Sequence, residues 1–499
     1  MRLTVYFILF LISFSASAQE SGKKIEIKNA DRLIGSRTGN ADLKRLIGNC
    51  VFQQDDVTLS CDSAILNSTT NKVDAYGNVH IKQGDSLNIY SDSLKYFGKT
   101  RTALLYDNIR LIDPRGTLYT DRMEYDIKTR VGTYYDGGKL IDKENVLTSK
   151  TGYYFSKQQE AYFKDSVVLT NPDYTIDCDT MRYNTSFKIA YFLGPTYIRT
   201  EEDLIYCENG YYNTVIDESR FSKNAYYQNK DQKLAGDSLV FKRDIGIGEV
   251  FRNITFTDTA QDILLKGHYA KYYENQDKIL VTDSAVLILT ADSDYLYMHG
   301  DTLISVYDSV TDNRTFYAYH GVKIFKSNFR GSADSVVYNS SDSLFKCYYE
   351  PTLWVEESQL TADSIHLFMR NKKLDKLNMY NNAFVTNPED STRYNQIRGR
   401  NMYGTFVNNK LSQLKVEGNG QSVYYAKEDD GGYVGVNQSE CSNMLIRFSK
   451  NQVSDISFYT QPVATFYPID EISTEDLQLK GFQWRIDRKP KSANDIFRD

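Results

Sequence analysis

The sequence predicts an all-β chain built from stacked repeats of about 29 residues. Forty tyrosines and 25 phenylalanines stand against two tryptophans and eight prolines, and aromatic side chains suit the half-buried surface of a pleated strand. Two sequence patterns recur with the same period. No segment shows the apolar spacing of 3.6 residues that indicates an amphipathic helix. A fixed period of this length is typical of an array in which each unit buries its apolar face against its neighbours.

The first residues predict a secretory signal peptide over residues 1–18. Arg2 is followed by an apolar run over residues 3–14, and small residues surround Ala18. This arrangement is typical of a cleavable export signal, and the run is shorter than the roughly 20 residues of a membrane span. We therefore expect residues 19–499 to be exported.

The first repeating pattern is an aspartate followed two positions later by an apolar residue. From Asp92 to Asp237 the step is 29 residues five times in succession, with Lys150 and Glu208 at the two stations that lack aspartate. The aspartates of the pattern are Asp31, Asp62, Asp92, Asp121, Asp179, Asp237, Asp334 and Asp363. We expect these carboxylates to bind backbone amides at strand corners. Calcium binding is less favoured, because each repeat supplies one acid and a calcium site needs several.

The second pattern is an aromatic residue, a short turn and then alternating apolar residues, as in residues 76–81, Tyr-Gly-Asn-Val-His-Ile. Glycine and asparagine tolerate positive φ, so each copy predicts a turn followed by a strand. A unit of 29 residues fits three or four strands of the usual five or six residues.

The repeat pattern has interruptions and an end. Polar insertions at residues 292–315, 387–396 and 427–439 are predicted as loops on one face of the array. The pattern covers residues 19–466. Residues 467–499 are predicted to form a short C-terminal cap over the last repeat, with a docking tail as the less favoured alternative.

The alternation of the two patterns resembles the repeated signature of the OstA-like family, which includes LptA and the N-terminal part of LptD. Residues 29–33 and 76–81 match best, and the resemblance covers about residues 25–466. It implies a V-shaped β-jellyroll whose two sheets splay apart and whose apolar interior shields acyl chains. It further implies a periplasmic protein of lipopolysaccharide or glycolipid transport to the outer membrane, with which it could associate. LptC-like and LptD-like partners, or a second copy joined head to tail, would bind through edge strands.

The predicted groove consists of inward apolar positions of the alternating strands. These are Val79, Ile81, Leu94, Ile109, Leu111, Met123, Val167, Leu169, Met181 and Ile198. Each would contact acyl chains without performing chemistry. A closed core requires the same alternation, so both interpretations stay open at this point.

Charge and cysteine usage exclude some function classes. The chain has 59 basic and 65 acidic residues, a balance that does not favour nucleic acid as a partner. None of the six cysteines forms a CxxC pair, so no metal knuckle or redox motif is predicted. Cys178 and Cys207 lie one repeat apart, and either a disulfide or two small interior residues would fit this spacing.

No catalytic residue, metal site or cofactor is predicted. Residues 84–87 and 236–239 spell the GDSL phrase of a serine hydrolase family, but Asp237 already belongs to the repeating aspartate pattern. The five histidines form no metal-binding motif. The competing interpretation is a β-helical surface or polysaccharide-binding protein in which the predicted loops form the site.

Overall fold

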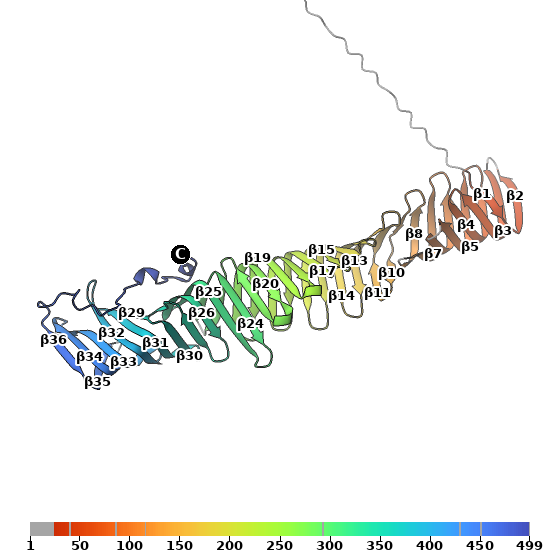
Figure 1. Ribbon diagram of the computed structural model, residues 1–499. Helices are drawn as coiled ribbons and strands as arrows, with labels where there is room; N and C mark the ends of the chain where they lie inside the picture. Colours follow the sequence, from red (N-terminus) through yellow and green to blue (C-terminus); the bar gives the residue numbers. More distant parts are fainter. Residues whose placement is uncertain are drawn as a thin grey trace, which may run out of the picture. The chain divides into compact units, whose positions relative to one another are not determined.

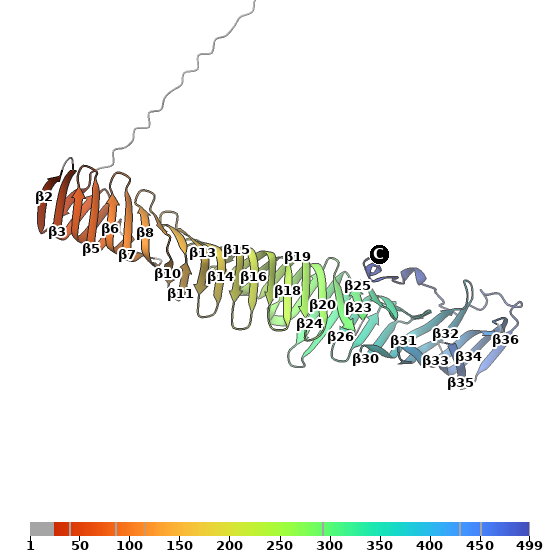
Figure 2. The same ribbon diagram turned by 180° about the vertical axis from the view of Figure 1, so that it is seen from behind.

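The computed structural model describes residues 24–38, 41–84, 87–114, 116–291, 294–428, 431–449 and 452–498. These residues form 36 strands and four short 3-10 helices (Figures 1 and 2), which confirms the predicted all-β class. The predicted signal peptide and two residues of the first GDSL phrase, Asp85 and Ser86, lie outside the described residues. Within the described ranges, no helix has the length and apolar character needed to cross a membrane.

The chain divides into two compact units, of which the first ends at Leu193 and the second begins at Gly194. The first unit contains β1 (Glu26–Asn29), β2 (Arg32–Thr38), β3 (Ala41–Gln54), β4 (Val57–Asn67), β5 (Lys72–Gln83), β6 (Leu87–Phe97), β7 (Thr102–Asp113), β8 (Gly116–Asp126), β9 (Val131–Tyr134), β10 (Gly138–Asp142), β11 (Asn145–Ser149), β12 (Thr151–Phe155), β13 (Glu160–Thr170) and β14 (Thr175–Asn184). The boundary falls within β15 (Ile189–Arg199).

The second unit contains β16 (Leu204–Asn213), β17 (Glu218–Gln228), β18 (Gln232–Lys242), η1 (Arg243–Ile245), β19 (Ile247–Asp258), β20 (Ile263–Tyr273), η2 (Glu274–Gln276), β21 (Lys278–Thr282), β22 (Val286–Ala291), β23 (Asp294–His299), β24 (Thr302–Asp308), β25 (Asn313–Lys326), β26 (Phe329–Asn339), β27 (Leu344–Tyr348), β28 (Thr352–Val355), β29 (Ser358–Thr361), β30 (Ser364–Arg370), β31 (Lys373–Pro388), β32 (Tyr394–Val407), β33 (Lys410–Lys427), β34 (Tyr433–Ser449), β35 (Gln452–Tyr459), β36 (Val463–Tyr467), η3 (Ile486–Arg488) and η4 (Ala493–Phe497).

One repeat of 29 residues is a hairpin of two long strands, and not the three or four short strands expected from average strand lengths. The strands β4, β5, β6 and β7 have 11 or 12 residues each and pair antiparallel in chain order. The repeating aspartates therefore fall on every second strand. Antiparallel neighbours also exclude the competing β-helix, whose successive turns pair in parallel.

Each long strand bends at its middle, which divides the sheet into two facing walls. In β5 the register shifts between Tyr76 and Val79, where Gly77 and Asn78 have φ of 73° and 43°. Positive φ is accessible to glycine and tolerated by asparagine. Wall 1 contains residues 57–60 of β4 and 79–83 of β5, and wall 2 contains residues 63–67 and 72–76. The bend produces the two-walled arrangement that the family resemblance implies.

The core lies between the walls and follows the two-residue period of the strands. In β5 the side chains of Val73, Ala75, Val79 and Ile81 are at most 1% exposed, whereas His80 on the opposite face is half-buried. Alternate side chains of a strand point to opposite faces. Stacking of successive hairpins then joins these inward side chains into a continuous apolar interior.

The insertions predicted as loops are parts of strands. Residues 294–299 and 302–308 form β23 and β24, and residues 387–396 consist of two strand ends joined by a short turn. Of the described residues in 427–439, Lys427 ends β33 and residues 433–439 belong to β34. In this part β31, β32, β33 and β34 reach 14 to 18 residues. Polar composition predicted loops, but the additional residues extend the hairpins instead.

The C-terminal tail, defined as residues 468–498, is not a cap on the last repeat. It returns along the sheet from β34 toward β23, and η4 lies against β23 and β25 (Figure 1, blue-violet). Leu477 and Leu479 complete a buried cluster with Phe384, Val423, Tyr425 and Val436. The tail follows this path because wall 1 is apolar on its outer face here.

Candidate functional site

The two repeating patterns of the sequence meet at the strand bends. The carboxylate of Asp62 accepts a hydrogen bond of 2.8 Å from the side-chain amide of Asn78, and Asp92 accepts one of 2.6 Å from Asn108. The same contact joins Glu208 to Asn224, Asp237 to Asn253 and Asp363 to Asn382. The donors in these contacts are side-chain amides of the asparagines at the bends, where backbone amides were expected. Among the described residues, no group of three or more acidic, histidine or cysteine side chains is arranged to hold a metal.

Eight of the ten predicted groove residues are buried between the walls. Their exposed fraction is at most 1%, for Val79, Ile81, Leu94, Ile109, Leu111, Met123, Val167 and Met181. Leu169 and Ile198 are partly exposed. The interior is therefore closed around some predicted residues and open around others. Their contact with acyl chains stays a prediction.

Hydrogen bonds join the two walls across the interior in the first repeats. The amide of Gln83 donates 3.1 Å to the carbonyl of Ile127 and accepts 2.7 Å from the hydroxyl of Tyr125. One repeat earlier, Gln54 donates 3.0 Å to the carbonyl of Gly98 and accepts from the hydroxyl of Tyr96. Both glutamines are 3% exposed. We call these contacts the glutamine–tyrosine latches.

The surroundings of the latches are consistent with a dry, closed interior. Burial raises the pKa of Tyr96 to about 12, although nearby Arg101 opposes the rise. Outside the latches, Arg101 lies 3.3 Å from Asp55, and Arg130 lies 3.1 Å from Asp56. Burial alone would raise the pKa of Asp56, but hydrogen bonds from Gln83 and Arg130 lower it below its usual value. Exposed ion pairs contribute only about 0–1 kcal/mol, so the buried glutamine–tyrosine bonds are the stronger closure.

The interior opens later in the first unit. A cavity of about 240 Å³ is lined by the apolar side chains of Leu111, Leu118, Leu140, Tyr154, Ala161 and Tyr183. Leu140 and Tyr183 are half-buried, and Asp142, Lys143 and Lys188 also line the cavity. We call this cavity, together with the partly exposed Leu169, the open segment. Its apolar surface with charged groups beside it suits an amphipathic ligand.

The second unit has half-buried side chains on the inward positions of β16–β18, at Ile205, Tyr212, Tyr227, Leu234 and Phe241. The hydroxyl of Tyr227 donates 2.7 Å to Asp203, and that of Tyr212 donates 2.8 Å to Asp217. These tyrosines present their rings to the interior while their hydroxyls are satisfied by carboxylates, as expected of an aromatic side chain at an apolar–polar boundary.

A buried ion pair closes the interior further along the second unit. Arg314 lies 3.7 Å from Asp258, and both side chains are 3% exposed. Gln232 donates 3.1 Å to Asp258, and Arg314 donates 2.9 Å to Ser305. Burial lowers the pKa of Arg314, and Asp258 opposes this shift. Sequence analysis missed this pair, because Asp258 and Arg314 are 56 positions apart and neither belongs to a repeating pattern.

All six cysteines are free and buried, including Cys178 and Cys207. They are therefore small interior residues, and the alternative of a disulfide between them does not hold. Cys50 and Cys61 are direct partners in the register of β3 and β4. Burial raises the pKa of Cys61 to about 12, and the neighbouring Cys50 is the second largest cause of this rise.

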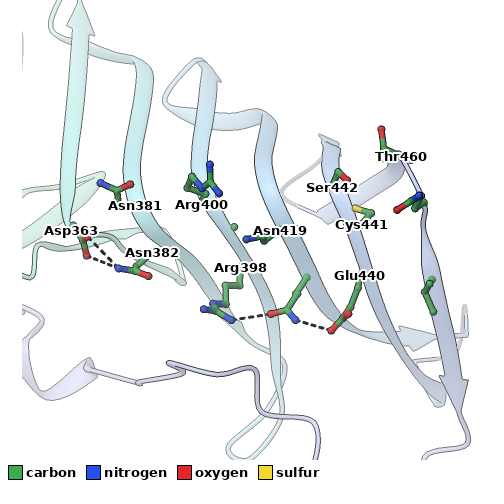
Figure 3. A pocket seen from close by; sticks show the side chains of 15 residues that line it. Asp363, Asn381, Asn382, Arg398, Arg400, Asn419, Glu440, Cys441, Ser442 and Thr460 are labelled. Atoms are coloured by element: carbon green, nitrogen blue, oxygen red, sulfur yellow. Dashed lines mark hydrogen bonds between the residues drawn. The ribbon is translucent and has the colours of Figure 1, made fainter.

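A polar groove of about 800 Å³ lies at the bends of the last strands (Figure 3). Arg398 donates 3.1 Å to Gln421, which donates 2.7 Å to Glu440. Asp363 lines the groove but is already bound to Asn382. The groove contains paired polar groups without an apolar floor, so it is a poorer site for an amphipathic ligand than the open segment.

A family model that matches part of the chain agrees with the resemblance found in the repeats. Residues 22–179 match the family model described as OstA-like protein. A structural match is the crystal structure of LptH, described as the LptA homologous periplasmic component of the lipopolysaccharide transport device from Pseudomonas aeruginosa. It shows 14% sequence identity and a TM-score of 0.22, and the match covers 24% of this chain and 83% of that chain. No curated protein matches the sequence.

Proposed function

We propose, from the match of residues 22–179 to the family model described as OstA-like protein, that the protein is a non-catalytic carrier of lipopolysaccharide or a related glycolipid. It would act in the periplasm and bridge part of the route to the outer membrane, and the acyl chains of the glycolipid would be held between the walls. The observation that carries the proposal is the open segment, where an apolar interior becomes accessible beside charged side chains.

The energetics of the open segment favour binding without directed transport. Each buried methylene contributes about 0.8 kcal/mol, so an acyl chain gains strongly by leaving water for a cavity lined by leucine and tyrosine. Within the open segment, neighbouring strands present similar apolar side chains, so the free energy of a bound acyl chain changes little as it moves along this segment. The protein can therefore lower the barrier to movement, and the work of transport must come from another component.

The predicted groove residues differ in how accessible they are to a ligand. Leu111 and Leu169 belong to the open segment, whereas Val79 and Ile81 lie behind the latch of Gln83. An acyl chain reaches Val79 only if the two walls part. We therefore propose that ligand enters at the open segment and does not enter through the first repeats.

The partners we propose are other bridge components, LptC-like or LptD-like, that add a strand to an edge of the sheet. In the first unit β1 and β2 both pair with β3, and Leu33 and Ile34 on β2 are 52% and 40% exposed. A strand with free backbone groups is a template for another chain.

A photo-crosslinking amino acid tests where the ligand binds. It is placed singly at Leu140, Leu169, Val79 and Tyr119 in the full chain, and the chain is irradiated with purified lipopolysaccharide. We expect adducts at Leu140 and Leu169, and none at the outward Tyr119, which serves as the matched control. Adducts at Val79 should appear only when Gln83→Ala opens the latch. Equal labelling at all four positions, or none at Leu140 and Leu169, would refute the proposal.

A further inference from the structure

The outer face of wall 1 carries buried apolar side chains in the last strands of the second unit. Two residues after the asparagine of the bend, three earlier repeats have His80, Arg110 and Thr255, and two others have Val51 and Tyr226. None of these five side chains is fully buried, whereas Phe384, at the same position in β31, is 5% exposed. Phe384, Val423, Tyr425 and Val436 are at most 5% exposed, because the tail covers them. An apolar outer face without such a cover would be an exposed patch of the kind that marks an interaction site.

Two buried glutamines hold the backbone of the tail. Gln396 accepts 2.9 Å from the amide of Leu479 and donates 3.4 Å to the carbonyl of Leu477. Gln359 accepts 2.6 Å from the amide of Arg485 and donates 2.6 Å to the carbonyl of Gln483. Each glutamine therefore binds the carbonyl of one tail residue and the amide of the residue two positions later. This contact requires an extended segment, and it depends little on side-chain identity.

Aromatic side chains and one charged group complete the contact. The ring centroid of Phe482 lies 5.2 Å from that of Tyr394, and the ring centroid of Trp484 lies 5.3 Å from the same tyrosine ring. Arg485 donates 3.1 Å to the hydroxyl of Thr352. We call this surface, formed by β28, β29 and β31–β34, the tail groove. It has the composition of a peptide-binding groove, with main-chain recognition between apolar pockets.

The tail reaches its groove by reversing direction beside an exposed edge strand. The turn begins directly after β36, where the amide of Glu471 donates 3.1 Å to the carbonyl of Pro468. In β36, Val463 and Phe466 are 67% and 51% exposed, and among the described residues the strand pairs with β34 alone. If the turn opened, the tail would extend past this edge instead of returning along its own chain.

We propose that the tail groove binds the tail of a second copy, so that two copies join at their C-terminal edges by exchanging tails. A second copy supplies the same backbone and apolar contacts that the groove makes within one chain. Exchange of an identical segment is a low-cost route to a dimer, because it replaces every contact that it breaks. The exchange requires the turn between residues 468 and 471 to open and the tail to leave its own groove. The proposal does not depend on lipid binding between the walls.

An isotope-mixing experiment tests the exchange in the full chain. Phe482 is replaced by a photo-crosslinking phenylalanine analogue, and unlabelled chains are incubated with an equal amount of chains labelled with nitrogen-15. After irradiation, we expect crosslinks from position 482 to peptides of β31 and β32. At complete exchange about half of them should join a labelled to an unlabelled chain. Exclusively same-isotope crosslinks would overturn exchange between copies, and the absence of crosslinks to β31 and β32 would overturn the groove itself.

Substitution of the glutamines separates docking from folding. We expect Gln359→Ala with Gln396→Ala to lower the yield of crosslinks from position 482 at least tenfold. Gln421→Ala on the same face is the matched control, because Gln421 binds Arg398 and Glu440 and not the tail. The yield in this control should stay within twofold of the parent chain. An equal loss in both variants would contradict a specific role of Gln359 and Gln396.

Discussion

The latch between Gln83 and Tyr125 allows a sharp test of how the first repeats are closed. Tyr125→Phe keeps the ring but removes the hydroxyl that donates 2.7 Å to the amide oxygen of Gln83. Tyr125 is 0% and Gln83 is 3% exposed, so the oxygen loses its donor without gaining water. Leaving a buried polar group without its partner costs about 1–3 kcal/mol. We expect this loss of local stability in the hairpins that contain β5 and β8.

Hydrogen exchange is the suitable assay, because a stacked array need not unfold as a single cooperative unit. A loss of about 1–3 kcal/mol corresponds to roughly 5- to 150-fold faster exchange of protected amides, since about 1.4 kcal/mol is a factor of ten. The comparison is between peptides of β5 and β8 and peptides of β31–β34 in the same sample. The distant peptides should be unchanged.

Tyr119→Phe is the matched control, since Tyr119 is 39% exposed on the outer face. Surface substitutions of this kind usually change stability by less than about 0.5 kcal/mol. If Tyr125→Phe accelerates exchange in β5 no more than Tyr119→Phe does, the hydroxyl does not hold the walls together. The proposal that the latches restrict ligand to the open segment would then lose its physical basis.

Four further predictions follow from named contacts. Asp258→Ala should lower the stability of the surrounding strands by about 3–5 kcal/mol, because the buried charge of Arg314 loses its partner. The double variant Asp258→Leu with Arg314→Met should recover most of this stability, as measured by the hydrogen exchange of the surrounding strands. Asn108→Ala should cost about 1–2 kcal/mol more than Asn108→Gly, because φ of 49° strains any residue with a Cβ atom, and thermal melts of the two variants would show equal midpoints if the backbone were unstrained. Cys61, with its pKa near 12, should resist iodoacetamide at pH 8 in the folded chain and react on unfolding, and rapid native alkylation detected by mass spectrometry would contradict its burial. The pKa of Tyr96 rises from 10 to about 12 on folding. The contribution of its neutral hydroxyl to folding stability should therefore be complete below pH 10 and be lost as the pH rises toward 12. Stability followed by circular dichroism should decline less over this pH range in Tyr96→Phe than in the parent chain.

The repeating residues of the sequence were sufficient to predict the fold class and to predict which face of each strand points inward. A strand places alternate side chains on opposite faces, so the alternation of Val79, His80 and Ile81 determines which of them are buried. The asparagine pattern predicted positive φ at these positions, because positive φ limits the residue types there, but it was interpreted as a turn between strands where the structure has a bend within one strand. The contact of the aspartates with the asparagines, as between Asp62 and Asn78, was not predicted, since it depends on the register of two neighbouring strands.

The tail was interpreted wrongly from the sequence for a related reason. Residues 467–499 lack the repeat and are largely polar, which favoured a short cap. Leu477 and Leu479 are buried only because Phe384 and Val423, on distant strands, leave an apolar surface uncovered. Spacing along the chain does not show that surface, because it is formed by outward side chains of several strands that are brought together only by their register.

The sequence by itself determined that this protein is a stacked all-β array of 29-residue repeats with an apolar interior, because the period and alternation are local properties of each strand. The tertiary structure decided that each repeat is a hairpin of two long, bent antiparallel strands. The tertiary structure decided where that interior is closed and where it is open. Closure depends on side chains from opposite walls, such as Gln83 with Tyr125 and Asp258 with Arg314, which meet although 42 and 56 positions separate them. These distances across the interior follow from how the walls face each other, and no pattern within one repeat contains them.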